Sequence, residues 1–358
     1  MVDIVRKTMR KAVEDGVFPS GQLLVVKGGS VVFHEAFGNC ELSTVFDVAS
    51  LTKPVATTTL AIQLVAEDKI RLNDPVSLLI PEFPKTKKPI LVSHLLSHSS
   101  GLPAWQPYYQ MIPKDDIGRP AGKREIIDAV CREPLEYETG YKSVYSDLNF
   151  ILLGEIIERV TKKSLDKLFA ERIAGPLKMD STLYRPLSVI AKAKPEAISH
   201  FAPTEDCPWR KKVLRGEVHD QNCFAMGGVA GHAGLFSTTT DLNKFITAFV
   251  ESYKGAGAFL SKDAVERFIP FRFKLTECNS TWLLGWDRPA HHDSQAGSHF
   301  SARSIGHLGF TGCSMWIDLE KDFWTVLLTN RIHPVSMNVK IRSFRPMLYN
   351  LVYEELIG

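Results

Sequence analysis

Apolar and polar residues along this chain repeat in two periods, one typical of helices and one typical of strands. The first twenty residues, MVDIVRKTMRKAVEDGVFPS, place charges between apolar positions and predict a short amphipathic helix. Residues 21–38, GQLLVVKGGSVVFHEAFG, are two apolar runs joined by Gly28 and Gly29, a pair that favours a tight hairpin turn. We therefore expect a helix and then a β-hairpin, which leads directly to the segment around Ser50.

The segment that follows the hairpin predicts a buried helix that begins close to Ser50. Proline is tolerated only around the first turn of a helix, so Pro54 places the start of this helix near Ser50. The N–H groups of a first turn lack partners within the helix and favour negative charge beside the serine oxygen. The apolar residues that recur at helical spacing are Leu51, Val55, Leu60, Ala61, Leu64 and Val65.

The middle of the chain, from about residue 71 to 186, is predicted to be mostly helices and loops. The clearest helical patterns cover residues 126–137, 148–160 and 164–175. Periodicity fades between residues 187 and 222, which predicts an irregular surface segment. The glycine-rich stretch 227–234 lacks the lysine of a phosphate loop, and we expect it to pack its backbone tightly beside a cleft.

Strand patterns return near the end of the chain. Ser304–Thr311, Ser314–Asp318 and Phe323–Thr329 predict an antiparallel meander. Residues 339–357 carry apolar positions at helical spacing and predict a closing amphipathic helix.

Strands at both ends with helices between them predict an α+β fold. We expect an antiparallel sheet built from both termini and flanked by helices, with a mostly helical insert. The sheet domain should comprise residues 1–70 and 223–358, and the insert residues 71–222. A ligand cleft is expected at the seam between them.

Composition and charge exclude several classes of protein. Of the 358 residues, 44% are hydrophobic and 23% charged, which excludes disordered and fibrous classes. A net charge of +3 does not indicate nucleic acid or an anionic membrane as a partner, and we expect the basic run 210–215 (RKKVLR) to be a solvated loop face. No export signal and no apolar run long enough to span a membrane is visible, so we expect a cytoplasmic protein.

Cysteine and histidine spacing argues against a disulfide framework and against a metal site. The histidines His291, His292 and His299 lack the spacing of a metal-binding motif and are expected at the surface. We expect reduced thiols, no metal and no cofactor. The six cysteines, none of them in a C-x-x-C pair, are Cys40, Cys131, Cys207, Cys223, Cys278 and Cys313.

Ser50 and Lys53 stand three residues apart at the predicted helix start, so both side chains can project from one side. A lysine desolvated in a pocket has a lowered pKa and can take the proton of a serine hydroxyl, which makes the serine a nucleophile. In the alternative, Ser50 merely caps the helix and Lys53 is solvated. That plainer account is favoured for the second match to this spacing, Ser164 and Lys167, so partners elsewhere must decide for Ser50.

Two later segments offer partners to a serine nucleophile, which needs a second proton carrier and oxyanion donors. Tyr145 precedes a strong helical pattern on a predicted loop and can point into a cleft, while Asp147 is placed to cap that helix. The alternative for Tyr145 is an ordinary half-buried loop tyrosine. Further along, His307 and Gly309 lie on a predicted strand that is followed by backbone able to offer N–H groups.

Three short motifs follow one another along the chain, SLTK at 50–53, YSD at 145–147 and HLG at 307–309. In this order and at these spacings they resemble the three motifs of the serine β-lactamase and penicillin-binding-protein superfamily, in its class C branch. Residues 94–103 (HLLSHSSGLP), residues 227–237 (GGVAGHAGLFS) and the final hairpin are similar to that branch too. The resemblance covers most of the chain.

This resemblance implies a role for each motif residue. Ser50 would be the acylated nucleophile, and Lys53 and Tyr145 would share the work of the base. The backbone N–H groups of Ser50 and Phe310 would hold the oxyanion. The residues implied to bind substrate are Asp147, His307 and Gly309.

Two departures from the pattern of this branch bear on the substrate. Asp147 stands where class C lactamases carry asparagine, and His307 stands where they carry lysine. A lysine would supply a permanent cation for a substrate carboxylate, whereas a histidine near its ordinary pKa is mostly neutral at pH 7. The second departure therefore favours esters over penicillins, as in the tyrosine-based carboxylesterases of the superfamily.

We expect a carboxylesterase that forms an acyl-enzyme with a small-molecule ester or amide substrate. The alternatives are a β-lactamase, a D,D-peptidase or D-aminopeptidase, and a non-catalytic binding protein on the same scaffold. The sequence predicts no oligomeric state and does not identify the natural substrate.

Overall fold

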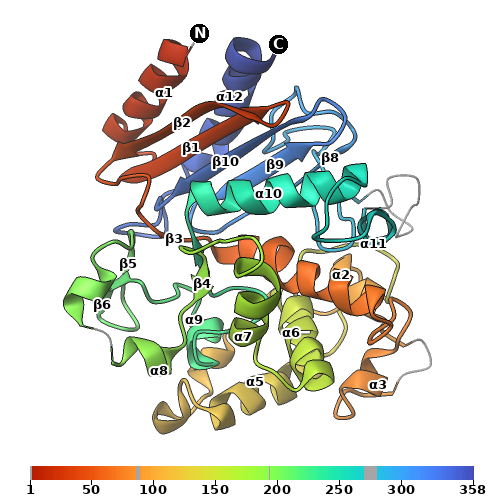
Figure 1. Ribbon diagram of the computed structural model, residues 1–358. Coiled ribbons are helices and arrows are strands. Elements are labelled where there is room, and N and C mark those ends of the chain that lie inside the picture. The colour runs from red at the N-terminus through yellow and green to blue at the C-terminus, as the bar shows by residue number, and fades with distance from the viewer. Residues whose placement is uncertain (1, 86–88, 193, 270–279) are drawn as a thin grey trace.

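A five-stranded antiparallel sheet brings the two ends of the chain together (Figure 1). The computed structural model describes residues 2–85, 89–192, 194–269 and 280–358. The strand order is β2-β1-β10-β9-β8. The strands are β1 (Ser20–Lys27), β2 (Ser30–Gly38), β8 (Ser304–Leu308), β9 (Ser314–Asp318) and β10 (Phe323–Thr329).

The centre of this sheet pairs the first strand of the chain with the last. β1 lies antiparallel to β10 on one side and to β2 on the other. Gly28 and Gly29 form the turn between β1 and β2 with φ angles of +57° and +78°, the left-handed conformation that a tight hairpin turn requires. The predicted hairpin and meander are confirmed, although β8 ends at Leu308 and so is shorter than predicted.

Helices cover both faces of the sheet (Figure 1). α1 (Val2–Glu14) and α12 (Ile341–Val352) pack on one face, where Val5 and Leu348 belong to one apolar cluster. α10 (Thr239–Lys254) packs on the other face against β1 and β10. Because both faces are covered, every residue of β9 and β10 is buried.

The other half of the molecule is mostly helical and lies on the α10 side of the sheet (Figure 1). Its central helix α6 (Asp147–Thr161) is largely buried and contacts α4 (Val92–Leu96) and α5 (Pro120–Arg132). The other α-helices of the described ranges are α2 (Thr59–Ala66), α3 (Val76–Leu79), α7 (Leu165–Phe169), α8 (Leu187–Ile190), α9 (Gln221–Ala225) and α11 (Lys262–Phe268). Two small sheets complete the fold, one of β3 (Phe46–Asp47), β7 (Leu235–Ser237) and β4 (Leu183–Tyr184), the other of β5 (Pro203–Cys207) and β6 (Lys212–Arg215).

The predicted helices are present, some with different ends. The helix predicted over residues 126–137 begins at Pro120 and ends at Arg132, because the residue before a proline disfavours helical backbone and Pro134 follows closely. α7 and α12 each continue into a short π-helical segment, η5 (Ala170–Ala174) and η7 (Tyr353–Ile357).

The prediction of an irregular surface segment for residues 187–222 is wrong. The segment contains α8 and the β5–β6 hairpin. Arg210, predicted to be solvated, is buried in an ion pair with Glu217 and also donates to the carbonyl oxygen of Val218. Strands this short show no clear period, and the burial of an arginine depends on partners that its own run of sequence does not reveal.

The predicted α+β class is confirmed, and the division into residues 1–70 with 223–358 and residues 71–222 stays a prediction. Within the described ranges, no helix has the length and apolar character needed to cross a membrane. The five described cysteines carry free thiols, and Cys278 lies outside the described residues. His291 and His292 are exposed, as predicted, and His299 is partly exposed.

Candidate active site

Ser50 lies in a short turn between the sheet half and the helical half. It belongs to the 3₁₀ turn η1 (Ala49–Leu51), which is followed by the π-helical segment η2 (Lys53–Thr58) and then by α2. Ala49 has a positive φ of +48°, and the Asp47 carboxylate accepts its backbone N–H at 2.9 Å. Ser50 thus stands just before the helical stretch formed by η2 and α2, as predicted, and its hydroxyl meets two side chains instead of capping the backbone.

The first of these side chains is Lys53, which is completely buried. Its Nζ lies 3.1 Å from Ser50 Oγ, 2.7 Å from Asp147 Oδ1 and 3.0 Å from the carbonyl oxygen of His232. Burial lowers the pKa of Lys53 below its ordinary value, although the Asp147 charge acts in the opposite direction. A neutral amine would donate its two N–H groups to Asp147 and His232 and would keep a lone pair for the Ser50 proton.

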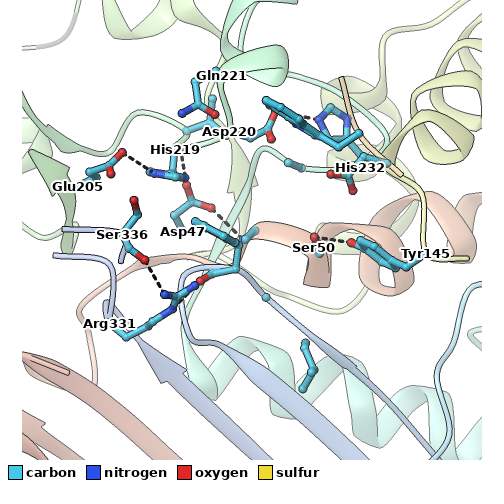
Figure 2. A pocket seen from close by; sticks show the side chains of 18 of the residues that line it. Asp47, Ser50, Tyr145, Glu205, His219, Asp220, Gln221, His232, Arg331 and Ser336 are labelled. Carbon is cyan, nitrogen blue, oxygen red and sulfur yellow. Dashed lines mark hydrogen bonds and ion pairs between the residues drawn. The ribbon is translucent and has the colours of Figure 1, made fainter. Parts of the chain in front are cut away.

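The second side chain is Tyr145, on the loop that precedes α6. Its hydroxyl donates to Ser50 Oγ at 2.8 Å (Figure 2), and Lys53 Nζ lies 4.9 Å from the centre of its ring. Burial, followed by the charge of Asp147, raises the pKa of the Tyr145 phenol well above its ordinary value. Tyr145 therefore holds its proton in the resting site and can donate it.

Asp147 does not cap α6 as the sequence predicts. It is itself the first residue of the helix, after Ser146, and its side chain caps no backbone N–H there. Its carboxylate accepts from Lys53 instead. Asp147 stands one residue past the N-cap, so its side chain is directed to the buried amine, and it also lines the pocket beside Ser50.

The predicted oxyanion donors are free to act. Within the described residues, neither the N–H of Ser50 nor that of Phe310 donates a hydrogen bond to the protein. Gly309 lies so close to the Ser50 turn that a Cβ on it would stand 2.6 Å from the carbonyl oxygen of Val48. The absence of a side chain at Gly309 therefore lets the end of β8 approach the nucleophile.

His307 lies on β8 and lines the same pocket. Its Nδ1–H donates to the carbonyl oxygen of Leu308 at 2.8 Å, which leaves Nε2 as an acceptor that has no partner in the described structure. Burial, and then the charge of Lys53, lowers the pKa of His307 to about 3. The sequence expectation of a histidine near its ordinary pKa is therefore wrong, although the ring is neutral at pH 7 as predicted.

A cavity of about 770 Å³ opens beside Ser50 (Figure 2). Arg331, Arg342 and Arg345 line it, and in the described part of the chain Arg331 and Arg345 donate to carbonyl and amide oxygens, with no carboxylate partner for any of the three. Burial, together with the charges of Arg345 and Arg342, lowers the pKa of Arg331 to about 10, so this guanidinium stays charged at neutral pH. The aromatic side chains that line the cavity are Trp105, Tyr109, Tyr145, Trp209, Trp282 and Phe310.

Several residues of the site are not predicted from the sequence. His232, whose carbonyl oxygen receives Lys53, also places its ring Nε2 2.9 Å from Asp220 Oδ1. The ring of His219 stacks on Phe310 and pairs with Glu205 at 3.0 Å. The polar residues around Asp220 could have indicated this part of the site. They lie, however, within residues 187–222, where weak periodicity predicts an irregular surface segment.

The glycine-rich stretch 227–234 packs as predicted. A Cβ on Gly231 would lie 2.1 Å from the carbonyl oxygen of Phe150 in α6, and a Cβ on Gly154 of the same helix would lie 2.9 Å from the backbone nitrogen of Gly231. This contact fixes the segment that presents the His232 carbonyl to Lys53. No group of three or more His, Cys, Asp or Glu side chains within the described ranges could hold a metal ion.

Comparison with known proteins places this chain in a family. Residues 5–343 match the model of the Beta-lactamase family, so the chain belongs to that family of serine hydrolases. The resemblance that the three motifs suggest is therefore confirmed.

Two relatives illustrate the range of names within the family. The N-acetylmuramyl-L-alanine amidase of Bacillus subtilis (strain 168) is 33% identical over 350 residues, which cover 88% of this chain and 78% of the relative. A protein of Escherichia coli (strain K12), named as a candidate D-alanyl-D-alanine carboxypeptidase, is 31% identical over 362 residues, 89% of this chain and 80% of the relative.

Solved structures share the fold. The octameric penicillin-binding protein homologue from Pyrococcus abyssi has a TM-score of 0.74 at 21% identity, covering 99% of this chain and 77% of its own. EstCE1, a hydrolase with promiscuous acyltransferase activity, has a TM-score of 0.71 at 20% identity and covers 96% of this chain and 98% of its own. These likenesses establish the β-lactamase type of fold for this chain.

Proposed function

We propose that this protein hydrolyses small acyl esters through an acyl-enzyme on Ser50, as a carboxylesterase. The observation that carries the proposal is the position of Ser50 Oγ, 3.1 Å from Lys53 Nζ and 2.8 Å from the Tyr145 hydroxyl. A serine hydroxyl is a weak nucleophile unless an adjacent group takes its proton. Here a buried amine with a lowered pKa is that group.

In acylation, Lys53 takes the hydroxyl proton while Ser50 Oγ bonds to the carbonyl carbon of the ester. The negative charge that develops on the carbonyl oxygen is held by the N–H groups of Ser50 and Phe310, which have no other acceptor among the described residues. As the tetrahedral intermediate collapses, the Tyr145 phenol gives its proton to the departing alkoxide and recovers one from the Lys53 ammonium. The alcohol leaves, and an ester of Ser50 remains.

In deacylation, a water molecule takes the place of the alcohol. Its proton passes to the Tyr145 and Lys53 pair, its oxygen attacks the acyl carbon, and the Ser50 oxygen leaves as it regains a proton. The same donors hold the second oxyanion. The enzyme returns to its starting protonation state, so the cycle consumes only ester and water.

Two features support esters as substrates. His307 is neutral at physiological pH and offers a substrate carboxylate no positive charge. The cavity also presents aromatic walls to an apolar acyl or alcohol group, since Trp105, Trp282 and Phe310 all line it.

A second candidate is an amide or peptide substrate that carries a carboxylate. Arg331, Arg342 and Arg345 line the cavity without a carboxylate partner in the described structure, and a substrate anion would suit them. The names of the two relatives, an amidase and a candidate carboxypeptidase, support the same alternative. A β-lactamase activity would also require a carboxylate to be bound.

One panel of substrates separates these candidates. We expect higher kcat/KM for p-nitrophenyl butyrate than for nitrocefin, a D-alanyl-D-alanine peptide or N-acetylmuramyl-L-alanine. Arg342→Gln should lower kcat/KM for the carboxylate-bearing substrates alone, by about tenfold if one charge-assisted hydrogen bond is lost. Faster turnover of the peptide or the muramyl amide than of the ester would contradict the esterase proposal and favour the second candidate.

A further inference from the structure

His98 lies beneath the loop that carries Tyr145. It follows α4 in the segment HLLSHSSGLP, is completely buried and has a positive φ of +55°. Its ring centre lies 4.8 Å from that of Tyr145, 4.5 Å from that of Trp282 and 5.2 Å from that of Phe150. A left-handed backbone at a residue other than glycine is costly, so its presence beside a reactive group suggests a function.

The contacts of His98 hold both neighbours of Tyr145 in the chain. The N–H of Val144 donates to the His98 carbonyl oxygen at 2.9 Å. The N–H of Ser146 donates to His98 Nδ1 at 3.1 Å. One residue thus fixes the backbone immediately before and immediately after Tyr145, while its ring packs against the phenol between them.

These contacts require a neutral ring with one particular tautomer. Because Nδ1 accepts a hydrogen bond, the ring proton is on Nε2. Burial, and then the charge of Lys53, lowers the pKa of His98 well below its ordinary value and keeps the ring neutral. Protonation of Nδ1 would turn the acceptor into a donor that faces the N–H of Ser146.

We propose that His98 is a positioning residue, which sets the Tyr145 hydroxyl at Ser50 by fixing the backbone on both sides of the tyrosine. This inference rests on the proposed function, since it assigns Tyr145 a part in acylation. His98 does not touch the reacting atoms, and its effect passes through Tyr145. A displacement of about 1 Å in a catalytic group can cost about 10²-fold in rate, so the loss of this support should be measurable.

The test compares substitutions that keep or remove the acceptor at the Nδ1 position. Asparagine carries an oxygen at that position and tolerates positive φ better than most residues, whereas leucine has similar bulk and no acceptor. We expect His98→Leu to lower the acylation rate constant for p-nitrophenyl butyrate by about 10²-fold with little change in KM. His98→Asn should recover most of that loss. If the leucine variant does not fold, His98→Gln replaces it, because its amide oxygen extends past the Nδ1 position.

A matched control lies four residues earlier in the same segment. His94 Nδ1 accepts the N–H of Leu91 at 3.1 Å, a contact of the same kind that faces the start of α4 and not Tyr145. His94→Leu should therefore lower the melting temperature while leaving acylation unchanged. The Tyr145→Phe variant distinguishes positioning from a general structural role. Adding His98→Leu to that variant should not lower the acylation rate further.

The outcomes are separable. Equal acylation rates for wild type and His98→Leu, or an equal loss in the presence and absence of the Tyr145 hydroxyl, would overturn the positioning role. Failure of His98→Asn to recover activity where His98→Leu loses it would also overturn it. If Ser50→Ala retains ester turnover, the proposed function itself fails. If Ser50→Ala loses turnover but the His98 variants keep the wild-type acylation rate, only the positioning role is rejected.

Discussion

At the scale of single residues, Ser50, Lys53 and Tyr145 form one hydrogen-bonded unit, and their contributions to rate should not be independent. We predict that Lys53→Ala and Tyr145→Phe each slow acylation severely, because each removes part of the same path for the serine proton. The double variant should be little slower than the worse of the two single variants. Burst kinetics on all three proteins measure this directly. Losses that multiply would mean that the two residues act separately.

The charge state of His307 gives a second prediction at this scale. Its pKa of about 3 means that the ring stays neutral between pH 5.5 and 8, so the preference of the wild type for neutral over anionic substrates should not change across that range. His307→Lys should raise the relative kcat/KM for carboxylate-bearing substrates by about tenfold to a hundredfold, the value of one charge-assisted hydrogen bond.

The measurement compares nitrocefin with p-nitrophenyl butyrate for both proteins at several pH values. A wild type that gains on nitrocefin as the pH falls from 8 to 5.5 would show that His307 titrates in that range. A wild type that already prefers nitrocefin at pH 8, with no gain in the lysine variant, would favour a β-lactamase.

At the scale of elements, the site depends on the contact between α6 and the glycine-rich stretch. Gly231→Ala would place a Cβ 2.1 Å from the Phe150 carbonyl oxygen, so the segment must move and take the His232 carbonyl away from Lys53. We predict a loss of ester turnover of at least about tenfold, since small displacements of catalytic groups are costly. Gly29→Asn, at a turn with open space around it, should leave turnover unchanged. Equal turnover in both variants would contradict the prediction that this contact positions the His232 carbonyl at Lys53.

The elements also show what the sequence can and cannot predict. Long amphipathic helices and the β1–β2 hairpin are visible because one face of each is buried and their turn residues are distinctive. The strands β5 and β6 are too short to establish a period. In the candidate site, too, some features are visible in the sequence. Ser50 and Lys53 can be recognised from their side-chain chemistry and their fixed spacing.

The contributions of His232 and His98 are harder to foresee, because both depend on the backbone. His232 offers Lys53 its carbonyl oxygen, and His98 receives one of its two loop contacts on its own carbonyl oxygen. Every residue has a carbonyl group, so the identity of a residue does not indicate that its carbonyl oxygen has such a role. The capping role expected for Asp147 failed for a related reason, since its true partner is distant in the chain.

At the scale of the whole molecule, the free energy of unfolding should decrease at acid pH, because neutral histidines are buried between the sheet and the helical half. His307 has a pKa of about 3 in the folded protein and about 6.5 when unfolded. Below pH 6.5 the unfolded chain binds a proton that the folded chain does not, so the stability that this group contributes at neutral pH is lost as the pH falls toward 3. The cost is about 1.4 kcal/mol per pH unit.

We therefore predict that His307→Asn loses less stability than the wild type between pH 6.5 and pH 5, by about 2 kcal/mol. Urea unfolding at the two pH values gives the four free energies required. Comparing the change with pH, and not the stability at one pH, removes the packing cost of the substitution. An identical loss in both proteins would mean that His307 is already protonated, or exposed, in the folded state.

The most direct measurement is the mass of the protein after brief mixing with p-nitrophenyl butyrate, followed by digestion. Wild type and Ser164→Ala should each gain one butyryl group, on the peptide that contains Ser50, because Ser164 only precedes α7 and has no base arranged as Lys53 is. Ser50→Ala should gain none and should lose ester turnover while keeping its fold, since its hydroxyl caps no backbone N–H and the loss of its hydrogen bonds to Lys53 and Tyr145 costs about 1 to 3 kcal/mol. A butyryl group on another residue, or undiminished turnover by Ser50→Ala, would contradict the assignment of Ser50 as the nucleophile.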